Sequence, residues 1–161
     1  QDELPRLLSD YQKKYQIKER NIIIFLNFTQ NKCIDIDNYC YCDLYKLAQL
    51  FKVFQLTKIL NKFAQDHSKD VSFMSKIIGE QQLIQNFSSF YNKKNISEIE
   101  NNLSNQIDEC FDNEFFNQLP ISIVLPIIEK SNRELIKDDS LYDFIAKSVE
   151  DRHVLFHFID I

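Results

Sequence analysis

The sequence predicts an all-α fold of stacked helical hairpins, with about eight or nine short helices. Two observations about composition support this. The 161 residues include a single glycine and three prolines, so two-residue β-hairpins, which usually need glycine, are hard to build. The third observation is that apolar residues recur at the spacing of one helix face over most of the chain. We therefore expect short amphipathic helices joined by short polar turns.

The first part of the chain is expected to contain three helices. Residues 19–28 are apolar at six of their last seven positions and predict a buried helix. Residues 33–37 alternate apolar and acidic side chains, which predicts at most one short extended segment. Residues 44–51 and 56–63 each carry apolar side chains at i, i+3, i+4 and i+7. Only residues 52–55 separate these two helices, which indicates a tight helical corner.

The second part of the chain is expected to continue the same pattern. Residues 73–78 form an apolar stripe that stops at Gly79, where a left-handed residue would end a helix. Residues 83–91 predict the next helix. Two capping boxes, Ser97 with Glu100 and Ser140 with Asp143, predict two further helix starts.

Two positions near the end of the chain bear on the last helices. Pro126 lies within an apolar run, so a helix either begins at it or bends there, and the sequence leaves both possibilities open. Asp151 is expected to cap a last helix over residues 152–159.

Composition also excludes several functions. Walker loops, dinucleotide fingerprints and nucleophile elbows need two or more glycines at fixed offsets. The net charge of −5 gives no reason to expect a nucleic acid or an anionic membrane as partner. The longest apolar run, residues 22–28, is far shorter than the ~18 residues that span a bilayer.

The four cysteines, Cys33, Cys40, Cys42 and Cys110, have the spacing of neither a zinc site nor a redox pair. We interpret them as reduced thiols and expect no cofactor and an intracellular, cytoplasmic protein. The alternative is a metal site that a histidine completes.

No arrangement of catalytic residues is recognisable. His153 and His157 stand four apart, as on one helix face, but no glutamate follows the first, as a metalloprotease would require. Asp35 and Asp37 alternate as carboxylates do in some metal or glycosidase sites, yet no acid/base partner accompanies them. We therefore predict that the protein is not an enzyme.

Aromatic side chains near the predicted corner give the candidate binding residues. Tyr41, Tyr45 and Phe54 lie around residues 41–54, and tyrosine and phenylalanine supply much of the energy of protein interfaces. The alternative is that most of them belong to the core.

Several stretches together carry a family resemblance. Residues 22–37 are followed by a helix with Leu47, Ala48 and Phe51, a tight corner and a second helix at 56–63. Further on stand FFNQLP at residues 115–120 and DDSLYDFI at residues 138–145. In this order they resemble the late BTB helices and the BACK domain of broad-complex and kelch-type adaptors. The amino-acid sequences of the later stretches are also similar to those of protist proteins in which such a region precedes ankyrin repeats.

The resemblance implies a late-BTB-like part at residues 1–67 and a BACK-like part at 68–161. It implies a protein–protein interaction or scaffold module of a longer adaptor, with protein partners and with a cullin scaffold of a ubiquitin ligase among the candidates. Homodimerisation stays open, because the BTB sheet and its dimer-forming helices have no counterpart here. The alternatives are a helical cap of an ankyrin or other repeat array and a small helical ligand-binding domain or enzyme.

Overall fold

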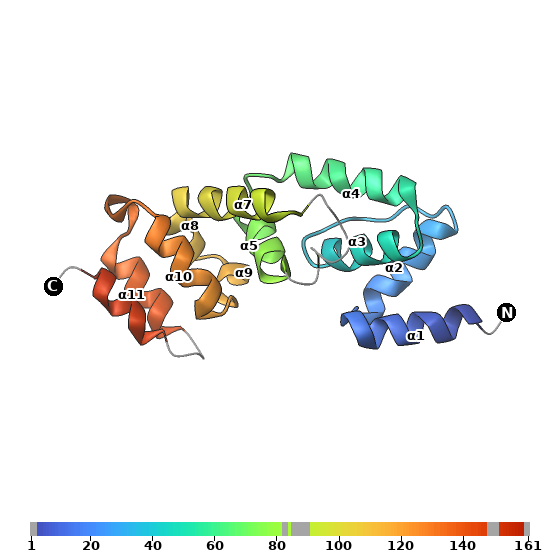
Figure 1. The fold of residues 1–161 in the computed structure, drawn as a ribbon, viewed down its shortest axis with the longest axis horizontal. Coiled ribbons are helices and arrows are strands. Elements are labelled where there is room, and N and C mark those ends of the chain that lie inside the picture. Colours follow the sequence, from blue (N-terminus) through green and yellow to red (C-terminus); the bar gives the residue numbers. More distant parts are fainter. Residues whose placement is uncertain (1–2, 82–83, 85–90, 148–151, 160–161) are drawn as a thin grey trace. The chain divides into compact units, whose positions relative to one another are not determined.

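The prediction of an all-α fold is confirmed by the structure, a computed structural model that describes residues 3–81, 84, 91–147 and 152–159. Within these ranges it contains ten α-helices, two short 3-10 helices and no strand (Figure 1). The helices are more numerous than the predicted eight or nine. The extended segment expected at residues 33–37 has no regular secondary structure.

The chain divides into two compact units. The first holds residues 3–66 and Ile84, and the second holds residues 67–81 and the described residues from 91 onward. The division after Asp66 lies one residue before the boundary expected from the sequence. The likeness of the two parts to BTB and BACK regions stays a prediction.

The first unit is built around one buried helix. Its elements are α1 (Glu3–Tyr15), α2 (Glu19–Thr29), α3 (Tyr41–Leu50) and α4 (Phe54–Asp66). Both α2 and α4 pack against α3, whose residues 41–48 are all buried. Helix α1 was not foreseen, whereas the other three follow the predicted ranges closely.

Helices α1, α2 and α3 end in the same way. Gln16, Asn31 and Lys52 each follow the end of a helix with a positive φ, between 54° and 59°. The next residue in each case donates its backbone N–H to a carbonyl five residues earlier, as in Ile17 to Gln12 at 3.0 Å. This is the Schellman motif, built here without glycine at the left-handed position.

The second unit is built around helix α5 (Val71–Gly79), which packs against α7 (Lys93–Asn105) and α9 (Glu114–Asn117). The remaining elements are listed in chain order: α8 (Ile107–Phe111), α10 (Ile121–Lys130), the 3-10 helix η1 (Arg133–Leu135), α11 (Asp138–Ala146) and the 3-10 helix η2 (His153–Phe158). Helix α10 packs against α7, and α11 packs against α8 and η2. The rings of Phe111, Phe116 and Phe144 meet in the core, with centroids 5.0 to 6.3 Å apart.

Gly79 ends α5 as predicted, but the predicted conformation is wrong. The φ of Gly79 is not positive. A Cβ atom built on Gly79 would lie 2.9 Å from Leu119 Cδ2, which is closer than real Cβ contacts. The glycine therefore permits a close approach between α5 and Leu119, and it supplies no left-handed turn.

Both capping boxes are wrong as helix starts. Asn92 caps α7 by accepting a hydrogen bond from Asn95 N at 3.0 Å, so the helix begins before Ser97. Helix α11 begins at Asp138, which leaves Ser140 inside its first turn. Asparagine and the acidic pair at residues 138–139 suit helix N-termini as well as serine does, and they come earlier in the chain.

Pro126 lies inside α10, which begins five residues earlier at Ile121. The proline cannot donate to the Ser122 carbonyl, so one intrahelical hydrogen bond is missing there. Most of the predicted helix over residues 83–91, and the predicted cap at Asp151, lie outside the described residues.

Candidate functional site

Phe54 is the most exposed large hydrophobic side chain among the described residues, at 73%. It is the first residue of α4, directly after the three-residue corner that follows α3. Exposure of a phenylalanine to this degree leaves most of its apolar surface in water, which is unfavourable unless something covers it.

The corner that carries Phe54 is braced by several hydrogen bonds. Val53 N donates to Ala48 O at 2.8 Å and closes the Schellman motif at Lys52. Gln49 Nε2 donates to Thr57 Oγ1 at 3.2 Å, which ties the end of α3 to the first turn of α4. The corner therefore fixes the position of the Phe54 backbone relative to α3.

Lysines accompany Phe54 on the outer side of α4. Lys58 and Lys62 follow at i+4 and i+8 and are exposed, so the three side chains share one helix face. From residue 44 to residue 65 the sequence holds four lysines and no acidic residue. We call the surface formed by Phe54, Lys58 and Lys62 the α4 face.

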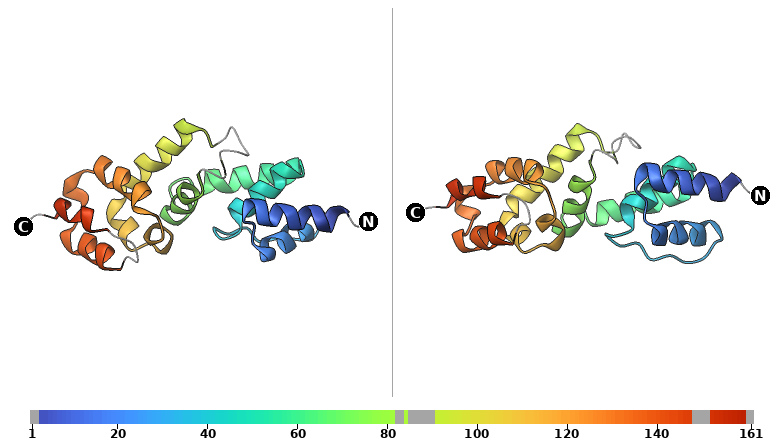
Figure 2. Two further views of the ribbon diagram at one scale, coloured as in Figure 1. Left: turned by 60° about the horizontal axis from the view of Figure 1, so that its bottom comes forward. Right: turned by 90° about the horizontal axis from the view of Figure 1, so that it is seen from below.

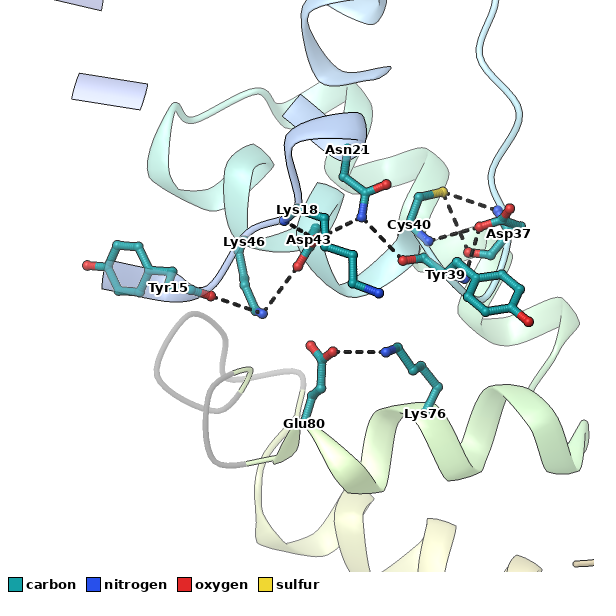
Figure 3. Close-up of polar contacts among 10 residues, drawn as sticks. All are labelled: Tyr15, Lys18, Asn21, Asp37, Tyr39, Cys40, Asp43, Lys46, Lys76 and Glu80. Atoms are coloured by element: carbon teal, nitrogen blue, oxygen red, sulfur yellow. Dashed lines mark hydrogen bonds and ion pairs between the residues drawn. The ribbon is translucent and has the colours of Figure 1, made fainter. Parts of the chain in front are cut away.

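A buried polar network fixes α3, on which α4 packs (Figure 3). The Asp43 carboxylate accepts hydrogen bonds from Lys18 N at 2.9 Å and from Asn21 Nδ2 at 2.7 Å. Its other oxygen lies 3.4 Å from Lys46 Nζ, which also donates to Tyr15 O at 3.5 Å. The network thus joins the end of α1, the start of α2 and the middle of α3.

Tyr41 and Tyr45, two of the three candidate binding residues, lie in the core of the first unit. Their exposed fractions are 0% and 1%, and the Tyr41 ring stacks on Phe63 with centroids 5.6 Å apart. Neither can touch a partner of the folded unit, because both stand on the helix that the unit surrounds. Of the three, Phe54 alone lies at the surface, and its binding role stays a prediction.

Asp37 has a structural role at the start of α3. Its Oδ1 accepts hydrogen bonds from Tyr39 N and Cys40 N, both at 2.9 Å (Figure 3). These contacts form the turn that precedes the helix. Asp35 contributes a backbone carbonyl near Cys40 Sγ, at 3.8 Å.

The cysteines are free thiols, of which Cys33 is exposed and the other three are buried. Burial raises the pKa of Cys40 to about 11 and the pKa of Cys110 to about 12. A thiol with so high a pKa carries little nucleophilic thiolate near neutral pH. Among the described residues, no group of three or more His, Cys, Asp or Glu side chains is placed to hold a metal ion.

The α-helix on which His153 and His157 were expected to share a face is not present. Residues 153–158 form a 3-10 helix instead. His157 Nδ1 contacts Val154 O within the same short helix.

Sequence reasoning missed Lys58 and Lys62, which share a face with Phe54. The absence of acidic residues from 44 to 65 was a signal that could have identified them. It also missed the partners of Asp43, because Lys18 and Asn21 are distant in sequence from α3.

Comparison with protein-family models, with curated proteins and with solved structures finds no match to this chain. Within the described part of the chain, no helix has both the length and the apolar character needed to cross a membrane.

Proposed function

We propose that the chain is a non-catalytic protein-interaction module whose partner binds the α4 face. The observation that carries this proposal is the 73% exposure of Phe54 on a braced helical corner. An aromatic side chain held by rigid backbone loses little conformational entropy on binding, and such residues are frequent hot spots of interfaces.

The charge of the α4 face indicates the chemistry of the partner. Lys58 and Lys62 follow the Phe54 ring on the same helix face and make no ion pair with any other described residue. A partner surface that offers an apolar pocket beside carboxylates would cover the ring and neutralise both charges.

The resemblance to BTB–BACK adaptors supports the proposal that this module belongs to a longer adaptor protein, with a cullin scaffold as one candidate partner. In that role the helical units would hold bound proteins without performing any chemistry.

The test compares two variants of the full chain for binding to purified cullin scaffolds and for proteins captured from cell extract. Phe54→Ala combined with Lys58→Glu is expected to lose at least about tenfold in affinity for any partner of the α4 face. Leu4→Ala is the matched control, because Leu4 is also an exposed apolar residue of the first unit, at 51%.

Equal binding by wild type and by the α4-face variant would contradict the proposal. Binding of a protein other than a cullin, lost in the α4-face variant alone, would support the interaction module and exclude the ubiquitin-ligase version of it.

A further inference from the structure

A second exposed aromatic surface lies in the second unit, on α11 and η2. Tyr142 is 57% exposed and Phe156 is 41% exposed, and their ring centroids lie 6.3 Å apart. Asp138 and Asp139 precede Tyr142 by four and three residues, so their side chains share its helix face. We call the surface formed by Asp138, Asp139, Tyr142 and Phe156 the α11 face.

The α11 face has a rigid support. Buried Arg152 donates to Phe144 O at 3.0 Å and to Asn117 O, and its guanidinium stacks 3.8 Å from the centre of the Phe144 ring. Arg133 Nη2 donates to Phe158 O at 2.9 Å. These contacts hold η2 against α11, and Figure 2 shows the two elements side by side near the C-terminus.

The α4 face and the α11 face have complementary chemistry. The α4 face presents an aromatic ring with Lys58 and Lys62, and the α11 face presents aromatic rings with Asp138 and Asp139. No ion pair joins any of these four charged residues to another described residue. If the two faces were in contact, the lysines of the α4 face would lie next to the aspartates of the α11 face.

The helical part of the α11 face is shorter than the α4 face. Asp138 to Tyr142 covers four residue steps of α-helix, about 6 Å, whereas Phe54 to Lys62 covers eight steps, about 12 Å. If the two helices lie antiparallel, Lys62 meets the acidic first turn of α11 and Phe54 lies towards the other end, beyond Tyr142.

From this complementarity we infer that the partner of the α4 face is the α11 face of a second copy of this chain. The contact is heterologous, because each copy uses a different surface on its two sides. The inference rests on the proposed function, since it names the partner of the α4 face.

The test measures the mass of the full chain by sedimentation velocity over a series of concentrations from micromolar to millimolar. Wild type is expected to show a weight-average mass that rises with concentration and falls when salt is added, because salt screens the charge pairs. An α4-face variant, Phe54→Ala with Lys58→Glu, and an α11-face variant, Asp139→Lys with Tyr142→Ala, are each expected to lose this rise.

A mixture of the two variants is the decisive sample. The intact α11 face of the first variant can still bind the intact α4 face of the second, after which the two faces left over lack the rings of Phe54 and Tyr142. Equal amounts of the two are therefore expected to form a dimer of one copy each. All the substituted residues are exposed, circular dichroism verifies that each variant is folded, and Leu4→Ala should associate as wild type does.

Three results would overturn the inference. They are a wild type that stays monomeric at every concentration, association that survives in both variants, and association lost in the α4-face variant alone. In each case the proposed function is still decided separately. Its test compares the binding of other proteins by the α4-face variant and by Leu4→Ala.

Discussion

Helix α3 is the buried centre of the first unit, and helix α5 has the same position in the second. Helix α3 places an ion pair at its centre, with Asp43 and Lys46 exposed by 5% and 1%. Helix α5 buries apolar residues on nearly every side, and its one buried polar side chain is Ser75. The central helix of the first unit therefore depends on specific polar contacts, whereas the central helix of the second depends on close apolar packing.

The two units also differ in how their helices end. In the first, residues other than glycine adopt the left-handed conformation at Gln16, Asn31 and Lys52. In the second, the single glycine adopts no such conformation and instead lets Leu119 approach α5. A scarce glycine is thus used where a side chain would collide, and the left-handed turns are built without one.

The largest expected effect comes from removing the carboxylate in α3. Asp43→Ala leaves Lys46 as a buried charge and deprives Lys18 N and Asn21 Nδ2 of their acceptor. Loss of one partner of a buried ion pair typically costs about 3–5 kcal/mol of unfolding free energy. Urea unfolding followed by circular dichroism measures this loss.

Lys46→Met is the matched control for the ion pair. It removes the other charge but leaves Asp43 with two hydrogen-bond donors, so we expect it to cost clearly less than Asp43→Ala. An equal cost for the two variants would mean that the ion pair, and not the junction with α2, supplies the stability.

An intermediate effect is expected in the second unit from Gly79→Ala. The added Cβ meets Leu119 Cδ2 at 2.9 Å, so the end of the Leu119 side chain, which is 5% exposed, must shift. Overpacking typically costs about 1–3 kcal/mol, which exceeds the gain of about 0.5–1 kcal/mol from replacing a helical glycine. We expect net destabilisation of about 1 kcal/mol.

The Leu119→Ala background tests the cause of that destabilisation, because it removes the colliding Cδ2 atom. There Gly79→Ala should become stabilising, and the same urea titration of the four chains gives the coupling. The same sign in both backgrounds would exclude the close approach as the reason for glycine.

The sequence predicted the class of fold and the positions of α2, α3 and α4, because apolar periodicity reports directly which helix face is buried. It did not predict helix starts reliably. Helix α7 starts after Asn92 and α11 starts at Asp138, so both start before the serines that were predicted to cap them. Several residue types can satisfy the same free N–H groups at a helix start.

The candidate site was predicted in part. Phe54 lies next to the α3–α4 corner as expected, but periodicity could not tell that Tyr41 and Tyr45 belong to a helix whose residues 41–48 are all buried. An amphipathic pattern assumes one solvated face, and α3 has none over residues 41–48. Phe54 is exposed because it opens the next helix, outside the apolar stripe that begins at Leu56.

The smallest expected effect is a gain in stability at the end of α1. Gln16 is exposed and has φ of 55°, a conformation that costs a non-glycine residue about 1–2 kcal/mol. Gln16→Gly removes this cost but increases the conformational entropy of the unfolded chain, which offsets about 0.4–1 kcal/mol. We expect net stabilisation of up to about 1 kcal/mol in urea unfolding.

Asn31→Gly is the matched control and should change little, because asparagine tolerates the left-handed conformation. Destabilisation by Gln16→Gly would show that the helix ends of the first unit carry no conformational strain, and would remove that difference between the two units.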